Sequence, residues 1–163
     1  MQVYLLRHGI AEEGGSNMSD SERSLTNEGR RKLRHVLTHI ADSGIKADLI
    51  ISSPIKRAQQ TAEIARSSLK CKEEVLFSRA LAPGATPEAV WEEIRAHRDQ
   101  ESLLLVGHNP LFSHLCGYLM GAQNLEVDFK KGAIMCLDFE SIGPKPHGTL
   151  RWYLTARLAG SCE

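Results

Sequence analysis

The chain has 163 residues, a length that suits one domain with a substantial hydrophobic core, so we expect residues 1–163 to form a single domain. Apolar residues make up 42% and charged residues 25%, the usual balance of a globular protein. The 20 basic and 20 acidic residues cancel, which argues against a general nucleic-acid or membrane-binding surface but permits a local basic pocket.

The first half of the chain alternates short apolar runs with helical patterns. Residues 3–6 predict a strand that is buried on both faces. A helix is predicted over about residues 25–43, with Thr26 as its N-cap. Residues 49–51 predict a second strand, after which Ser53-Pro54 is expected to cap and open another helix.

The second half continues this alternation. Residues 75–77 predict a short strand, Thr86-Pro87-Glu88 opens a helix, and residues 103–106 form the clearest strand of the chain. Asn109-Pro110 is expected to cap the next helix, and two late strands are predicted at residues 133–139 and 150–155. This order predicts an α/β fold, a three-layer α/β/α sandwich around a mostly parallel sheet with a mixed edge.

Charged and titrating side chains follow three of the predicted strands. Arg7-His8-Gly9 follows the first strand, Arg57 lies in the first helical turn after the second, and His108 follows the strand at 103–106. Sites in open α/β sheets form at the carboxyl ends of strands, so we expect these residues to lie together. Each part alone has an ordinary structural explanation, and only the combination indicates a site.

This combination is suited to phosphate chemistry. The fork of donors on arginine matches phosphate oxygens, and the helix N-termini after Ser53 and Asn109 add backbone N–H groups. A histidine whose pKa is lowered by nearby cations keeps one ring nitrogen unprotonated and can act as a nucleophile. A second histidine, if protonated, can donate to the oxygens of a phosphoryl group in transit.

The other histidines and the cysteines indicate no second site. His35 and His39 have the i,i+4 spacing of a metal pair but no evident third ligand, His97 and His147 are expected at the surface, and His114 is a candidate for supporting His108. The four cysteines (Cys71, Cys116, Cys136 and Cys162) lack the spacing of a zinc site or disulfide framework, so we expect reduced thiols in a cytoplasmic protein. Cys116 and Cys136 are expected in the core.

Four blocks of sequence resemble the histidine phosphatase superfamily, and more narrowly its small SixA-type phosphohistidine phosphatases. The blocks are LLRHGIAE at the start, RSLTNEGRRK at 23–32, IISSPIKRAQQTAEI at 50–64 and LLLVGHNPLFSHL at 103–115. The resemblance implies the phosphoglycerate mutase-like fold of that superfamily and a phosphohistidine intermediate on His8. It also implies that Arg7, Arg57 and His108 hold the phosphate without a metal or other cofactor, with Gly9 letting the backbone pass close to it.

One departure from many relatives concerns the general acid. The region between the strand at 75–77 and the next helix reads RALAPGATPEAV, with no acid before Glu88, which is expected inside the helix. SixA-type proteins are similar in lacking this acid, which suits a P–N bond whose imidazole leaves more easily than an alkoxide. Four acids remain open as proton donors to an ester: Glu12, Glu13, Asp20 and Glu88.

The leading interpretation is a metal-independent phosphatase that acts on the phosphohistidine of a phosphotransfer or phosphocarrier protein. The alternatives are a small-molecule phosphomonoesterase that uses the same residues and, from another class, a phosphoprotein-binding module without turnover. The glycine- and serine-rich segment 11–24 adjoins the predicted site and is expected to be a mobile loop that either gates it or is merely solvated. Neither a nucleic-acid nor a membrane partner is expected.

Overall fold

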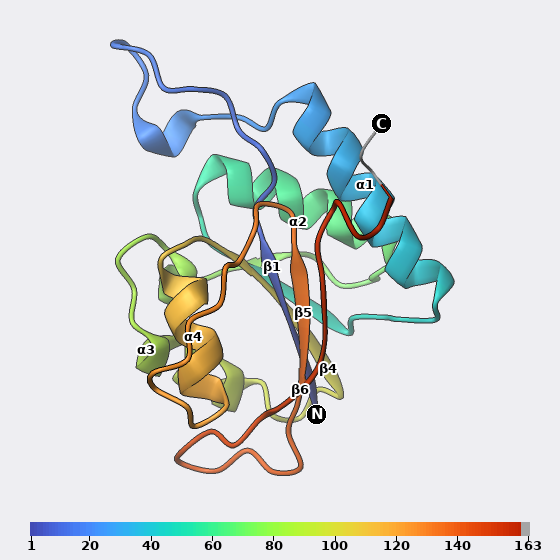
Figure 1. Ribbon diagram of the computed structural model, residues 1–163, viewed down its shortest axis with the longest axis vertical. Helices are drawn as coiled ribbons and strands as arrows, with labels where there is room; N and C mark the ends of the chain where they lie inside the picture. Colours follow the sequence, from blue (N-terminus) through green and yellow to red (C-terminus); the bar gives the residue numbers. More distant parts are fainter. Residues whose placement is uncertain (161–163) are drawn as a thin grey trace.

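The computed structural model describes residues 1–160, which form a six-stranded mixed sheet flanked by helices (Figure 1). The strands are β1 (Gln2–Arg7), β2 (Leu49–Ser52), β3 (Leu76–Phe77), β4 (Ser102–Gly107), β5 (Ile134–Asp138) and β6 (Thr149–Leu154). The α-helices are α1 (Asn27–Asp42), α2 (Lys56–Ser68), α3 (Pro87–Ala96) and α4 (Leu111–Leu119), and two 3-10 turns are η1 (Asp20–Glu22) and η2 (Arg79–Leu81). Within the described part of the chain, no helix has the length and apolar content needed to cross a bilayer.

The strand order in the sheet is β3-β2-β4-β1-β5-β6. The pairs β2–β3, β2–β4 and β1–β4 are parallel, whereas β1–β5 and β5–β6 are antiparallel. The expected parallel sheet with a mixed edge is therefore confirmed. Because β1, β4 and β2 are neighbours that run in one direction, their carboxyl ends meet at the same edge of the sheet.

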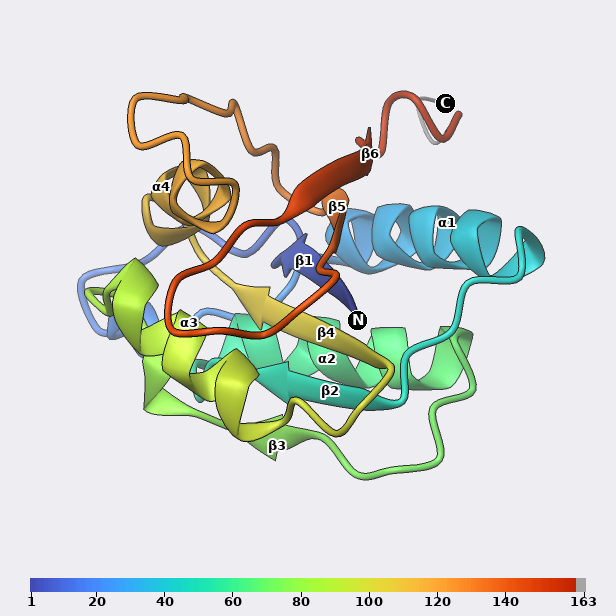
Figure 2. The same cartoon turned by 90° about the horizontal axis from the view of Figure 1, so that it is seen from below.

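Both faces of the central strands are buried, as the unbroken apolar runs predict. Along β1, Val3 and Leu5 pack into a cluster with α3 and α4, while Tyr4 and Leu6 pack into a second cluster with α1 and α2. Figure 2 shows α3 and α4 on one side of the strands and α1 on the other. The predicted three-layer arrangement is confirmed.

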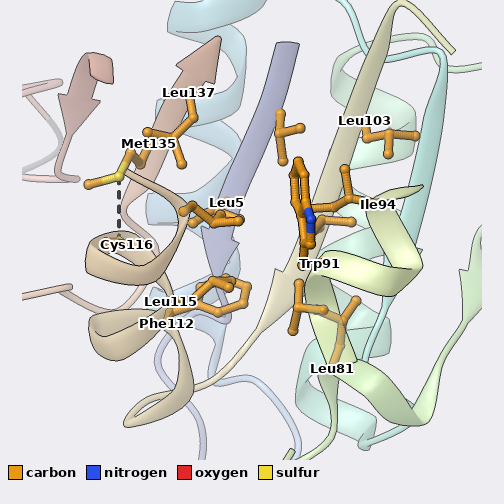
Figure 3. Close-up of a cluster of buried hydrophobic side chains, with 14 of the residues drawn as sticks. Leu5, Leu81, Trp91, Ile94, Leu103, Phe112, Leu115, Cys116, Met135 and Leu137 are labelled. Atoms are coloured by element: carbon orange, nitrogen blue, oxygen red, sulfur yellow. Dashed lines mark hydrogen bonds between the residues drawn. The ribbon is translucent and has the colours of Figure 1, made fainter. Parts of the chain in front are cut away.

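The core between the sheet, α3 and α4 is drawn in Figure 3. Trp91 on α3 lies against Phe139, with ring centroids 5.2 Å apart, and the sulfur of Cys116 lies 3.5 Å from that of Met135. Cys116 is fully buried and Cys136 nearly so, which confirms the expected core cysteines. Cys162 lies outside the described residues.

The helix starts confirm two predicted caps and contradict two others. Thr26 accepts from the backbone N–H of Gly29 and Thr86 from that of Ala89, as N-caps do. Ser53 and Asn109 do not cap their helices, because α2 begins only at Lys56 and α4 at Leu111, each without a side-chain cap. Their side chains are used elsewhere: the hydroxyl of Ser53 binds a ring nitrogen of His108, and the amide of Asn109 donates to the carbonyl of Phe129.

Candidate active site

The ends of β1, β2 and β4 are tied together by backbone hydrogen bonds. The N–H of His8 donates to Gly107 O at 3.0 Å, and that of Ser53 donates to Val106 O at 2.9 Å. These bonds place the residues that follow the three strands side by side. The structure therefore brings together the four side chains that the sequence singled out, here called the strand-end group: Arg7, His8, Arg57 and His108.

His8 is buried, with 6% of its surface exposed. Its Nδ1 lies 2.8 Å from the carbonyl oxygen of Gly9, which can only accept, so Nδ1 carries the ring proton and Nε2 keeps its lone pair. Burial is the main cause that lowers the pKa of His8 to about 4, and the charges of Arg57 and Arg7 act in the same direction. His8 is thus a neutral imidazole at neutral pH, with an unprotonated Nε2 that accepts from Arg57 Nε–H at 3.4 Å. The cations that the sequence suggested are the lesser cause of the lowered pKa.

Arg57 lies in the first turn of α2 and is 6% exposed. Its Nε points at His8 Nε2, 3.4 Å away. Its Nη1 donates to the backbone carbonyl of Asp20 at 2.8 Å, and its Nη2 donates to the carboxylate of the same residue at 3.0 Å. Asp20 therefore holds the outer end of the guanidinium, while the edge that carries Nε faces the nucleophile.

His108 is the most buried member of the group, at 2% exposure. Its ring lies 5.0 Å from that of His8, centroid to centroid, and its Nε2 lies 2.8 Å from Ser53 Oγ. Burial, followed by the neighbouring charges of His8 and Arg57, lowers the pKa of His108 to about 3. His108 is therefore neutral at neutral pH, and not the protonated donor that the sequence left open.

Several polar atoms of this region have no partner. Within residues 1–160, four buried side-chain nitrogen or oxygen atoms are unpaired: Arg7 Nε, Arg95 Nε, His108 Nδ1 and Asn109 Oδ1. Two of them belong to the strand-end group, and a third lies on the residue after His108. Arg7 Nε is a donor and Asn109 Oδ1 an acceptor, while His108 Nδ1 is either one, depending on the tautomer. Buried polar atoms without partners are costly, so these three indicate a place for a polar ligand.

Gly9 has a structural reason besides the phosphate contact that the resemblance implies, which stays a prediction. A Cβ on Gly9 would lie 2.6 Å from Cδ1 of Leu33 on α1, so the missing side chain makes room for that helix. Its backbone N–H donates to Thr61 Oγ1 at 3.2 Å. The close approach at Gly9 is therefore between the loop after β1 and α1.

The remaining histidines lie away from the strand-end group. His35, His39, His114 and His147 are exposed, and His97 pairs with Glu93 on α3. His35 Nε2 bonds to the carbonyl of Ala159 at 2.6 Å. No group of three or more potential metal ligands occurs among the residues that the structure describes.

Of the four acids left open as proton donors, Asp20 is the one that contacts the strand-end group. Hydrogen bonds from Arg23, and next from Arg57, lower the pKa of the Asp20 carboxyl, so it is a carboxylate at neutral pH. Glu88 is exposed in the first turn of α3, and Glu12 and Glu13 are exposed in the loop. The 11–24 loop is tied to α2 where Arg57 Nη1 donates to Asp20 O at 2.8 Å, and its two ends are joined where Arg23 Nε donates to Glu12 O at 2.6 Å.

Three features of the site were missed by the sequence analysis. They are the contact of Ser53 with His108, the clamp of Asp20 on Arg57, and the carbonyl of Phe129, which accepts from Arg7 Nη1 at 2.6 Å. The contact of Ser53 was missed because Ser53-Pro54 is a pattern typical of a helix start. The contact of Asp20 was missed because its neighbours in the sequence are those of an ordinary polar loop. The sequence contained no signal for Phe129, because a backbone carbonyl leaves no residue-specific pattern.

The chain is similar to known proteins in sequence and in fold. Residues 3–82 match the family description "Histidine phosphatase superfamily (branch 1)". The chain is also 33% identical, over 112 residues, to an uncharacterized protein of Picosynechococcus, a match that covers 68% of this chain and 67% of that protein. Together with the fold and the strand-end group, these matches establish that the chain belongs to the histidine phosphatase superfamily.

Within this superfamily the chain is similar over nearly its whole length to SixA proteins. It is 26% identical to phosphohistidine phosphatase SixA of Escherichia coli over 157 residues, covering 95% of this chain and 94% of that one. The solved structure of the protein histidine phosphatase SixA complexed with tungstate superposes with a TM-score of 0.87 at 25% identity, covering 96% of this chain and 98% of that one. These likenesses support phosphatase activity.

Proposed function

We propose that this protein is a phosphohistidine phosphatase that removes the phosphoryl group from a protein histidine through a covalent intermediate on His8. The observation that carries the proposal is the neutral, buried imidazole of His8, whose Nε2 is unprotonated and faces Arg57 Nε at 3.4 Å. The likeness to SixA supports the substrate class, and the tungstate complex of that relative supports an oxyanion at this site.

In the first step, the lone pair of His8 Nε2 attacks the phosphorus and the P–N bond to the substrate imidazole breaks. The leaving nitrogen keeps that electron pair and takes a proton from water. Arg57 and Arg7 donate to the phosphoryl oxygens and offset their negative charge. Water then attacks the phosphorus, the bond to His8 breaks, and inorganic phosphate leaves. Because the arginines supply the positive charge, we propose that no metal is required.

The ionised state of Asp20 favours a P–N substrate. An alkoxide leaving group needs a proton in the transition state, and the acid that lies against the strand-end group has already lost its own to solvent. An imidazole leaves without that help more readily than an alkoxide. The hydroxyl of Ser53 is committed to His108 and does not replace the missing acid.

The test compares the wild type with His8→Ala on two kinds of substrate, in EDTA at neutral pH. The first is a histidine phosphotransfer protein labelled with ³²P, and the second is a panel of phosphate esters that includes p-nitrophenyl phosphate. We expect the wild type to release ³²P-phosphate from the protein far faster than phosphate from the esters. His8→Ala should lose this activity, and a control variant, His114→Ala, should keep it because His114 is exposed on α4.

Two results would replace this proposal. Ester turnover as fast as that of the phosphoprotein would indicate a small-molecule phosphomonoesterase with a proton donor outside the strand-end group. Reversible binding of the phosphoprotein, with neither phosphate release nor transfer of ³²P to His8, would indicate a binding module.

A further inference from the structure

We propose that Ser53 is a positioning residue that holds His108 in its Nδ1–H tautomer, so that a neutral His108 donates a hydrogen bond to the phosphoryl group. This inference rests on the proposed function and assigns a role to a residue that the sequence pattern marked only as a helix cap. It requires the serine hydroxyl to be the donor in the Ser53–His108 hydrogen bond.

The surroundings of Ser53 identify the hydroxyl as that donor. Ser53 is fully buried, and its Oγ has two partners among residues 1–160: His108 Nε2 at 2.8 Å and the backbone N–H of Ile55 at 3.3 Å. The N–H of Ile55 can only donate, so the oxygen accepts from it. If the oxygen also accepted from His108, its own hydrogen would be buried without an acceptor. The hydroxyl therefore donates to Nε2, which must be the unprotonated nitrogen.

The other ring nitrogen then carries the proton. His108 Nδ1 is buried and has no partner in the part of the chain that the structure describes. The same is true of Arg7 Nε, and the His108 ring lies 5.0 Å from that of the nucleophile His8. An N–H at this position attracts a phosphoryl oxygen, whereas a lone pair repels it. The tautomer therefore decides whether His108 helps or hinders binding.

A tautomer fixed by Ser53 removes the need for a charged His108. Burial, and next the charges of His8 and Arg57, lower the pKa of the His108 ring to about 3, so it enters the reaction neutral. A neutral imidazole has one N–H, and without a fixed partner on Nε2 that hydrogen can lie on either nitrogen. Ser53 directs it toward the phosphate side of the ring.

The experiment reads the tautomer directly. The ring ¹⁵N chemical shifts of His108 are measured in ¹⁵N-labelled protein without ligand, and the spectrum of His108→Gln identifies the signals of this residue. We expect the Nδ1–H form in the wild type and a shift toward the Nε2–H form in Ser53→Ala. Ser53→Cys keeps the size of the side chain but donates more weakly, so it should fall between the two.

Tungstate affinity is measured on the same proteins. Ser53→Ala should bind tungstate about tenfold more weakly, the effect of losing one hydrogen bond from a water-excluded site. The matched control is Ser52→Ala, which removes a neighbouring, equally buried hydroxyl that donates to the carbonyl of Ser53 and does not contact His108. Ser52→Ala should leave both the tautomer and the affinity nearly unchanged.

The inference is overturned if His108 is in the Nε2–H form in the wild type, or if it keeps the Nδ1–H form in Ser53→Ala. Equal losses of tungstate affinity in Ser52→Ala and Ser53→Ala would also overturn it, since they would indicate a general structural effect. These readouts need no substrate turnover. A protein whose tautomer responds to Ser53 but that does not cleave phosphohistidine would refute the proposed function and leave the role of Ser53 standing.

Discussion

Two buried histidines, 5.0 Å apart and both with lowered pKa values, are oriented for different tasks by single hydrogen bonds. The carbonyl of Gly9 accepts a hydrogen bond from Nδ1–H of His8, so Nε2 keeps the lone pair that we propose attacks the phosphorus. At His108 the proposed arrangement is reversed, because Nε2 is hydrogen-bonded to the hydroxyl of Ser53 and the buried Nδ1 has no partner among residues 1–160. In the proposed mechanism, these partners prepare one ring to act as the nucleophile and the other to act as a donor.

Asp20 competes with an oxyanion for Arg57. Its carboxylate accepts from Arg57 Nη2 at 3.0 Å and adds a negative charge beside an arginine that we propose binds the oxyanion. We expect Asp20→Asn to bind tungstate about two- to fivefold more tightly, the equivalent of the ~0.5–1 kcal/mol typical of exposed ion pairs. Isothermal titration calorimetry of the variant and the wild type measures this difference.

Glu22→Gln is the control, since it removes an acid from the same 3-10 turn. The carboxylate of Glu22 accepts from the Ser19 N–H, and within residues 1–160 no hydrogen bond joins it to Arg57. Weaker tungstate binding by Asp20→Asn would mean that Asp20 chiefly orients the guanidinium, contrary to this prediction.

At the scale of elements, the strands and helices could be predicted from the sequence because apolar residues recur at regular spacing along each of them and occupy the positions that face the core. The strand-end residues Arg7, His8, Arg57 and His108 could be predicted because each follows a strand that could be recognised. Ser53 and Asn109 were mispredicted as caps because the same residue types favour helix starts and turns, and only their contacts across the sheet edge decide between the two. The contact of Asp20 with Arg57 joins a loop to a helix far along the chain, and no local pattern encodes such a pair.

The packing of α1 against the loop after β1 makes a prediction about Gly29. Alanine normally stabilises a helix over glycine by about 1 kcal/mol. A Cβ on Gly29, however, would lie 2.3 Å from the backbone oxygen of Ile10. We therefore expect Gly29→Ala to lower the free energy of unfolding by about 1–3 kcal/mol, as overpacking does, and to reduce activity because Ile10 follows the His8-Gly9 turn.

Urea denaturation measures the loss of stability. Gly15→Ala is the matched control, because nothing lies within 4 Å of a Cβ placed there. A Gly29→Ala protein as stable as the wild type would show that α1 can move away from Ile10 at little cost.

For the whole molecule, the two histidines predict a dependence of stability on pH. Both histidines bind a proton less readily in the folded chain, where their pKa values are about 4 and about 3, than in the unfolded chain, where the pKa has its usual value of 6.5. Between these limits the unfolded chain binds more protons, so folding stability is full above about pH 6.5 and is lost as the pH falls toward 4. We expect the free energy of unfolding to fall by at most about 6 kcal/mol over this range, since two groups are displaced and one pKa unit corresponds to about 1.4 kcal/mol.

Denaturation series at several pH values measure this slope. Carboxylates titrate in the same range, so the comparison is with His108→Gln, whose stability should fall less steeply between about pH 6.5 and pH 4. An identical slope in the two proteins would contradict the prediction.

The position of β4 between β1 and β2 governs when the site can exist during synthesis. The ribosome delivers β1 and β2 first, at roughly 5–20 residues per second, and the strand that hydrogen-bonds to both of them follows only later. Until then the nascent chain carries Arg7 and His8 at the end of β1 and Arg57 on the helix after β2, without the strand that lies between β1 and β2. Such long-range strand pairing is slow because the chain must lose the conformational entropy of closing a large loop before any stabilising contact forms. The strand-end group is therefore assembled in one late event, when β4 enters the sheet and brings His108 with it.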